Sequence, residues 1–120
     1  MDKTEIRQTI SATTLIGDKV RNRQGEDLGK IEDLMTDLES GCVAYAVLSF
    51  GGVLGTGDKL FAVPWEALSL DQRENVFIMN IDKQRLEQAP GFDKNNWPDF
   101  ADPTWGSDIY RYYGYRAYWE

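Results

Sequence analysis

The stretch LGKIEDLMTDLESGCVAYAVLSFGG, residues 28–52, decides the fold of this chain. It joins an acidic, half-apolar segment, through Glu39, Ser40 and Gly41, to the most apolar run of the protein, VAYAVLSF at residues 43–50. A glycine with short polar neighbours is typical of a turn, so the stretch is predicted to form a β-hairpin. The apolar run fills both alternating faces of its strand, which indicates a central strand covered on both sides.

The first half of this hairpin is harder to assign. Its apolar residues match the spacing of a helix better than a two-residue alternation, and they are Leu28, Ile31, Leu34, Met35 and Leu38. Glycines bound the segment on both sides, however. We therefore predict a strand with one bulge near Asp33 and Leu34, because a bulge returns later side chains to the same face of the sheet.

The chain on either side of the hairpin also divides into short apolar segments separated by turns. Further strands are predicted at residues 19–24, 60–65, 68–70 and 76–81. Asp82 is a suitable N-cap for a short helix over residues 83–89, with Leu86 and Ala89 on one face. About five or six short strands at this spacing predict a mainly β fold, a small antiparallel barrel followed by a short helix.

The composition changes after the predicted barrel. Ten of the fifteen aromatic residues lie between Phe92 and Trp119. Within this segment Asp102 and Pro103 have the order of an N-cap followed by the first helical residue, and Gly114 is a suitable end, so a second short helix is predicted there. We divide the chain into a flexible lead-in at 1–10, a barrel at 11–92 and an aromatic C-terminal extension at 93–120.

Composition limits the possible functions. A chain of 120 residues is one domain in length and buries roughly two-thirds of its unfolded surface. Its net charge of −7 argues against a general affinity for nucleic acid and favours basic or neutral protein partners. No membrane span or signal peptide is evident, and the single cysteine, Cys42, favours a reducing compartment, so a cytoplasmic location is predicted.

The sequence contains no histidine. The commonest general base and metal ligand is therefore missing, and histidine-dependent nucleophile chemistry is impossible within one chain. We therefore expect that the protein is not an enzyme and that it has no cofactor and no metal site. The glycine loop at 51–59 has an aspartate, Asp58, where a phosphate-binding loop needs lysine. The carboxylates between Glu26 and Glu39 are predicted to be a solvated face, and Cys42 is predicted to be buried and inert.

The aromatic extension is the one feature that the barrel does not require, and two interpretations stay open. Trp97, Phe100 and Trp105 are expected to pack back on the chain, whereas residues 110–119 are expected to contact another copy or another protein, because Trp, Tyr and Arg are enriched at interface anchors. The candidate partner interface comprises Trp105, Tyr110, Tyr112, Tyr113, Tyr115, Tyr118 and Trp119.

The chain also resembles the PRC-barrel family. The resemblance rests on SATTLIGDKV, the hairpin NRQGEDLGKIEDLMTDLESGCVAYAVLSFGG, DKLFAVPWEAL and FIMNIDKQRLEQAPGF, which together cover about residues 11–92. The C-terminal segment is similar to that of stand-alone bacterial members. The family includes the cytoplasmic domain of the photosynthetic reaction centre H subunit and the C-terminal domain of a ribosome maturation factor.

What this resemblance implies is a small β-barrel used for binding or assembly. The leading hypothesis is a non-enzymatic module that self-associates, as a dimer, or docks on a protein partner. The alternative is a ligand-binding or electron-transport-associated module similar to the H subunit domain. No family residue with a chemical role transfers to this chain, because the shared positions, such as Gly25, Pro64 and Trp65, are turn and core positions.

Overall fold

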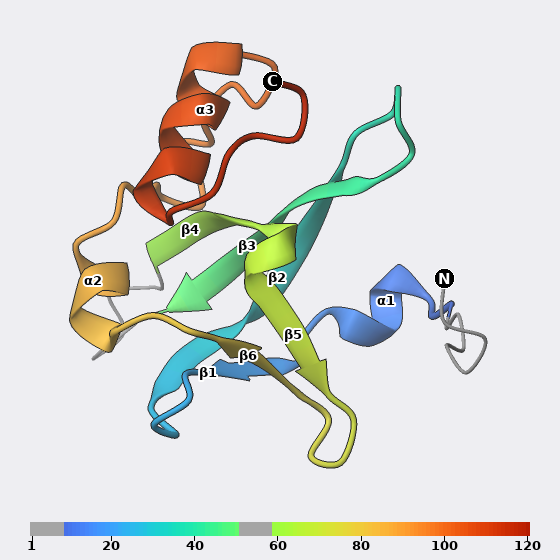
Figure 1. The fold of residues 1–120 in the computed structure, drawn as a ribbon, viewed down its shortest axis with the longest axis vertical. Helices are drawn as coiled ribbons and strands as arrows, with labels where there is room; N and C mark the ends of the chain where they lie inside the picture. The colour runs from blue at the N-terminus through green and yellow to red at the C-terminus, as the bar shows by residue number, and fades with distance from the viewer. Residues whose placement is uncertain (1–8, 51–58) are drawn as a thin grey trace.

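Six strands form one curled sheet in a computed structural model that describes residues 9–50 and 59–120 (Figure 1). The strand order is β4-β3-β2-β1-β6-β5. The elements, in chain order, are α1 (Ala12–Leu15), β1 (Lys19–Arg21), β2 (Asp27–Thr36), β3 (Val43–Phe50), β4 (Lys59–Pro64), the 3-10 turn η1 (Trp65–Ala67), β5 (Leu68–Asp71), β6 (Val76–Met79), α2 (Lys83–Glu87) and α3 (Pro103–Tyr112).

The predicted hairpin is confirmed as β2 and β3. Its register passes from the pair Ile31 and Leu48 to the pair Asp33 and Val47, so one extra residue lies on β2, beside the predicted position of the bulge. Gly29 allows β2 to approach β3 closely, because a Cβ there would lie 2.1 Å from the carbonyl oxygen of Ser49. The local geometry of the hairpin therefore explains why a helical spacing of apolar residues forms a strand.

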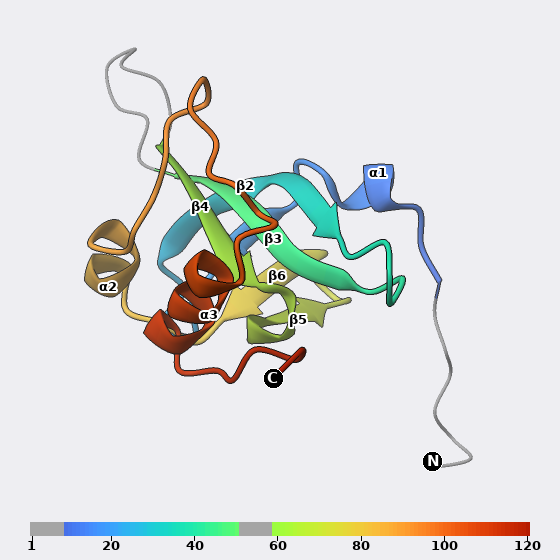
Figure 2. The same ribbon diagram turned by 90° about the horizontal axis from the view of Figure 1, so that it is seen from above.

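One strand pairing differs from the prediction of an antiparallel barrel. β1 and β6 are parallel, with Val20 opposite Phe77, while the other four pairs of neighbouring strands are antiparallel. The reason is topological: β6 reaches β1 after the chain has crossed over through β4, η1 and β5, so a direct hairpin turn does not set its direction. The mainly β fold is confirmed, and its sheet curls as a half-barrel (Figures 1 and 2).

The inside of the curled sheet holds the larger of two apolar clusters, which we call the barrel core. It is mostly aliphatic and comprises Leu15, Val20, Leu28, Ile31, Ala46, Leu48, Phe50, Phe61, Val63, Ala67, Phe77, Met79, Leu86 and Ala89. Leu86 enters it from α2 and Ala89 from the residues that follow, because the helix predicted over residues 83–89 ends at Glu87. Asp82 occupies the N-cap position of α2, but its side chain makes no capping hydrogen bond.

The C-terminal extension lies across the outside of β3 and β4 and forms a second cluster, which we call the extension core (Figure 2). Its buried members are Ala44, Tyr45, Ala62, Ile109, Tyr110 and Ala117. α3 begins as predicted, because the Asp102 carboxylate accepts hydrogen bonds from the backbone N–H groups of Thr104 and Trp105. β3 is thus covered on both faces, as its sequence predicted.

The prediction that Cys42 is buried is wrong. Its side chain is exposed, because it lies in the turn before β3 begins at Val43. The apolar character of β3 therefore does not extend to the residue that precedes it. Among the described helices, none has the length and apolar composition that crossing a membrane requires.

Candidate functional site

The seven aromatic residues of the predicted interface have three different environments. Trp105 and Tyr110 pack within the extension core or against it, Tyr112 and Tyr113 lie where α3 meets α2, and the remaining three are about 40% exposed. The exposed residues are Tyr115, Tyr118 and Trp119. The seven residues were predicted to form one interface, but in the structure they are divided between one core and two surfaces.

Tyr110 cannot belong to an exposed interface, which corrects one member of the predicted set. Its side chain is only 2% exposed, and its hydroxyl donates a 2.7 Å hydrogen bond to the carbonyl oxygen of Ala44 on β3. Burial raises the pKa of this phenol well above its usual range. The residue fastens α3 to the sheet instead of facing a partner.

Trp105 is half-buried and takes part in an aromatic cluster on β3. Its ring lies 4.8 Å from the ring of Phe100 and 5.5 Å from that of Tyr45, measured between centroids. Phe100 in turn makes an edge contact with Tyr45 at 5.4 Å. This part of the extension was expected to pack back on the chain, and it does so on the outer face of the sheet.

Tyr112 joins α3 to α2 through reciprocal contacts with Arg85. The Tyr112 hydroxyl donates to the carbonyl oxygen of Arg85 at 2.6 Å, and the Arg85 guanidinium donates to the carbonyl oxygen of Tyr112. The guanidinium carbon also lies 4.4 Å from the centre of the Tyr112 ring, a cation–π contact. These contacts set the position of α2 against the end of α3.

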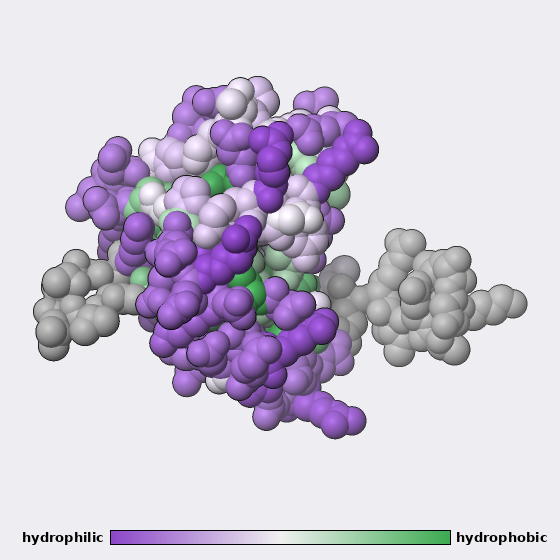
Figure 3. Space-filling view, turned by 60° about the vertical axis from the view of Figure 1, so that its left-hand side comes forward, coloured by the Kyte–Doolittle hydropathy of each residue, from purple (hydrophilic) through white to green (hydrophobic). Residues whose placement is uncertain are grey.

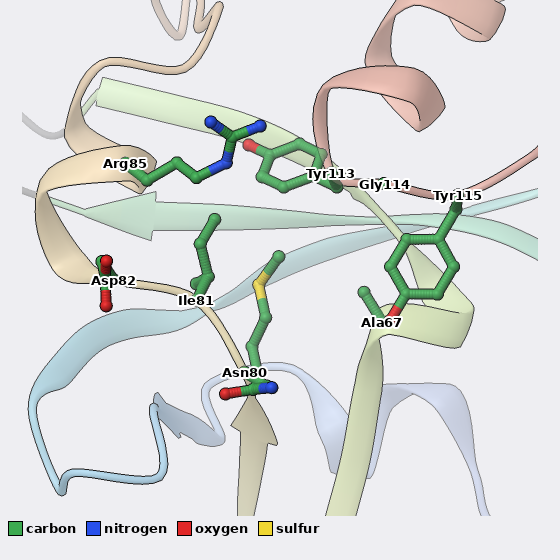
Figure 4. A pocket seen from close by; sticks show the side chains of 9 residues that line it. Ala67, Asn80, Ile81, Asp82, Arg85, Tyr113, Gly114 and Tyr115 are labelled. Atoms are coloured by element: carbon green, nitrogen blue, oxygen red, sulfur yellow. The ribbon is translucent and has the colours of Figure 1, made fainter.

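A first concave site lies between α2, the end of β6 and the residues that follow α3, and we call it the α2 pocket (Figure 4). Its volume is about 580 Å³. It is lined by Ala67, Met79, Asn80, Ile81, Asp82, Arg85, Tyr113, Gly114 and Tyr115. The face of the molecule that carries α2 and α3 is mostly hydrophilic, with small apolar patches between barrel and extension (Figure 3).

Tyr113 is the unusual residue of the α2 pocket. Its phenol points toward Arg85 (Figure 4), yet its buried hydroxyl has no hydrogen-bond partner among the described residues. Burial raises the pKa of this phenol well above its usual range. An unpaired buried hydroxyl costs free energy, so this position is less favourable than that of Tyr110.

The second concave site lies between the β2–β3 hairpin and the C-terminal extension, and we call it the hairpin groove. Its volume is about 530 Å³. Most of its lining is apolar or aromatic, and the full set is Met35, Thr36, Asp37, Leu38, Glu39, Ala44, Tyr45, Phe100, Ala101, Asp102, Pro103, Tyr118 and Trp119. The groove therefore joins two of the predicted interface residues to a hairpin that the sequence did not associate with them.

A hydrogen bond across the hairpin groove connects its two sides. The Tyr118 hydroxyl donates to the Asp37 carboxylate, which also accepts from the backbone N–H of Glu39 at 2.9 Å. The hydrogen bond from Tyr118 lowers the pKa of Asp37 below its usual value, and the N–H of Glu39 adds to this effect. Partial burial and the bond to Asp37 raise the pKa of Tyr118 to about 12. The carboxylate is therefore anionic at neutral pH.

The groove is acidic as well as apolar. Its charged side chains are Asp37, Glu39 and Asp102, and no lysine or arginine of the described residues lines it. Leu38, at the hairpin tip, is 94% exposed, the highest exposure of any large apolar side chain described. The carboxylates of residues 26–39 were predicted to be a solvated face, and Leu38 among these residues was the sequence signal for an exposed apolar side chain at this edge.

No group of three or more His, Cys, Asp or Glu side chains within residues 9–50 and 59–120 is arranged to hold a metal ion. The glycine loop considered for phosphate binding, at 51–59, lies outside the described residues except for Lys59. Neither concave site contains a nucleophile paired with a general base. The side chains that line the hairpin groove are mainly aromatic, apolar and acidic, and those that line the α2 pocket are of mixed character.

A curled six-stranded β-sheet that encloses an apolar core defines a small β-barrel-type domain. The chain belongs to the PRC-barrel family, since the PRC-barrel domain matches residues 7–86, which is 80 of the 120 residues. The predicted family is thus confirmed. The match ends before the C-terminal extension, so α3 and most of both sites' aromatic residues lie outside it. No curated protein matches this chain.

Proposed function

We propose that this chain is a non-enzymatic binding or assembly module that docks on a protein partner or self-associates. Membership of the PRC-barrel family supports a binding role. The observation that carries the proposal is the hairpin groove, which is lined both by exposed aromatic side chains of the extension and by an exposed leucine of the hairpin. Interfaces are enriched in such aromatic residues at their centres.

The surface we assign to this function is narrower than the set predicted from sequence. Tyr118 and Trp119, with Leu38, offer accessible apolar area at the hairpin groove. Tyr115 is also exposed, but it lies at the α2 pocket and is not part of this surface. The two sides of the hairpin groove come from the barrel and from the extension. Binding of a partner there would therefore depend on the position of the extension relative to the barrel. A cytoplasmic location stays a prediction.

The test is partner capture by the full chain, with variants at each surface. Leu38→Ala and Trp119→Ala should each weaken capture of a specific partner from the native host, or weaken self-association in sedimentation velocity, whereas Tyr115→Ala should not. Circular dichroism would verify that each variant is folded. A full chain that stays monomeric at high concentration and retains no specific, cross-linkable partner would contradict the proposal.

Ligand binding is a second candidate function, favoured by the α2 pocket. There the unpaired Tyr113 hydroxyl and the Arg85 guanidinium lie on one wall of a concave site. A small acidic or quinone-like molecule would find donors there, which agrees with the resemblance to the reaction centre H subunit domain. A rise in melting temperature with a quinone, a nucleotide or a carboxylate, lost in Tyr113→Phe, would support this role, and a flat response would remove it.

A further inference from the structure

We infer that the hairpin groove binds a lysine or arginine side chain presented by a basic segment of a partner protein. This inference rests on the proposed docking function and specifies the chemistry of the partner. The juxtaposition that carries it is an aromatic and apolar floor with carboxylates along its edge. A long cationic side chain has the matching construction, with an apolar stem and a charged head.

The aromatic groups of the groove are arranged to receive a stem and a cation. Tyr45 and Phe100 are in edge contact at 5.4 Å, and Tyr118 and Trp119 are in edge contact at 5.0 Å between centroids. All four residues line the groove. Because Tyr118 and Trp119 are about 40% exposed, part of their ring surface is open to a ligand, and cations are attracted to the faces of Trp and Tyr rings.

The charge of the groove selects a cation over an anion or a purely apolar ligand. Asp37 and Glu39 lie at the hairpin side, and the Asp37 carboxylate also accepts a hydrogen bond from Tyr118 across the groove. Asp102 adds a third carboxylate, although its Oδ1 is occupied at the start of α3. With no basic side chain of the described chain among the lining residues, this negative potential is left for a partner to neutralise.

The same charges favour a basic partner over a second copy of this chain. Each copy carries a net charge of −7, so bringing two acidic grooves or two acidic chains together is opposed by repulsion. A bare metal ion is also a poorer fit, because these carboxylates do not converge as metal ligands within the described residues. A protein segment can supply both the charge and the apolar neighbours that would cover Leu38.

The test is selection of random 12-residue peptides displayed on phage against the immobilised full chain. Selected peptides should contain lysine or arginine beside apolar or aromatic residues well above their frequency in the starting library. Representative peptides, synthesised with blocked ends, would then be titrated by ¹⁵N NMR. The Trp119 indole and the backbone amides of residues 37–39 should shift together and saturably, and added salt should weaken binding.

Matched variants separate the groove from general charge attraction. The pair Asp37→Asn with Glu39→Gln should weaken peptide binding about fivefold, as two exposed ion pairs allow. The pair Glu87→Gln with Asp108→Asn changes the net charge equally at exposed positions outside the groove and should leave binding within about twofold. Trp119→Ala should weaken it roughly tenfold, through lost stacking and cation–π contact.

Failure of this inference can be told from failure of the docking function. Peptides without an excess of lysine and arginine, or no enriched peptide at all, would overturn the cation preference. Equal peptide binding by the Asp37→Asn/Glu39→Gln variant and the Glu87→Gln/Asp108→Asn variant would overturn the assignment of the binding site to the groove. In each case the capture and sedimentation experiments with Leu38→Ala and Trp119→Ala still decide whether the chain docks on a partner by other chemistry.

Discussion

The barrel core and the extension core lie on opposite faces of β3, and they are held together in different ways. The barrel core is mainly aliphatic and is enclosed by strands whose backbones are hydrogen-bonded to one another. The extension core is rich in aromatic rings, and the isolated bridge between Leu60 of β4 and Phe92 lies just before the extension begins. Side-chain packing and tyrosine hydroxyl groups therefore hold the extension in place, whereas backbone hydrogen bonds between strands hold the barrel together.

This difference locates the sensitive points of each region. Three tyrosines of the extension donate hydrogen bonds to residues outside it: Tyr110 to Ala44, Tyr112 to Arg85 and Tyr118 to Asp37. Loss of one such group acts on the docking of the extension, whereas loss of volume inside the sheet acts on the whole fold. The family match covers the barrel and not α3, so properties particular to this chain are expected in the extension.

The largest effect is expected from a cavity in the barrel core. Leu48→Ala removes a fully buried side chain from β3 and should lower the free energy of unfolding by about 2–5 kcal/mol, measured by urea denaturation. Leu38→Ala is the matched control, since the same substitution at a 94% exposed position should change stability by less than about 0.5 kcal/mol. Similar decreases in the free energy of unfolding of both variants would contradict the assignment of Leu48 to the core and of Leu38 to the exposed hairpin tip.

A smaller loss is expected where the extension approaches the sheet. A Cβ at Gly106 would lie 2.4 Å from the Tyr45 hydroxyl and 2.8 Å from the Trp119 ring. Gly106→Ala should therefore displace α3 and lower the free energy of unfolding by about 1–2 kcal/mol, since overpacking exceeds the gain in helix propensity. Near-UV circular dichroism should change with it.

Asp108→Ala, at an exposed position of α3, is the control for Gly106→Ala and should leave the near-UV spectrum unchanged. If Gly106→Ala stabilises the protein and keeps that spectrum, the close packing of the extension on Tyr45 would be refuted.

Removal of two different tyrosine hydroxyls of the extension should change the stability of the protein in opposite directions. Tyr110→Phe removes a buried donor and its hydrogen bond to the Ala44 carbonyl oxygen, so the free energy of unfolding should fall by about 1–2 kcal/mol. Tyr113→Phe removes a buried hydroxyl without a described partner and should be neutral or stabilising by up to about 1 kcal/mol. Thermal and urea unfolding would measure both, and a reversed order would contradict the hydrogen-bond assignments.

The smallest effect concerns the contact between the extension and the hairpin. The pKa of Asp37 is lowered from 3.8 in the folded protein, first by Tyr118. The stabilisation from this group is thus present above pH 3.8 and is lost as the pH falls through the folded pKa. NMR titration of the Asp37 carboxyl carbon should give a pKa below 3.8, and Tyr118→Phe should move it back toward that value. An unchanged pKa in the variant would show that Tyr118 does not hold the hairpin.

Much of the fold could be predicted because its signals are local. The turn at Glu39–Gly41, the apolar run of β3 and the Asp102–Pro103 start of α3 each depend on neighbouring residues. The parallel pairing of β1 with β6 could not be predicted in this way, because it depends on how a distant crossover returns the chain. The exposure of Cys42 was missed because this residue lies one position before β3, in the turn, where the apolar character of the strand no longer decides burial.

The candidate site was predicted only in part, since the sequence located the aromatic extension but not the surface it makes. Tyr110 and Tyr118 are eight positions apart in similar surroundings, yet one is buried on Ala44 and the other faces Asp37. The contribution of Leu38 and Asp37 was missed because they lie some eighty residues earlier in the chain. No periodicity within the extension could connect them.

The sequence by itself determined the strands, the bulged hairpin, the capped helix and the family, because backbone conformation and turn chemistry are set by adjacent residues. Only the tertiary structure decided which aromatic side chains are buried, which remain exposed, and that an acidic hairpin and an aromatic extension enclose one groove. The physical reason is that burial and charge environment depend on contacts between segments distant in the chain. Residues 28–50 therefore form two inner strands of the sheet and, at the tip of the hairpin, one wall of the hairpin groove.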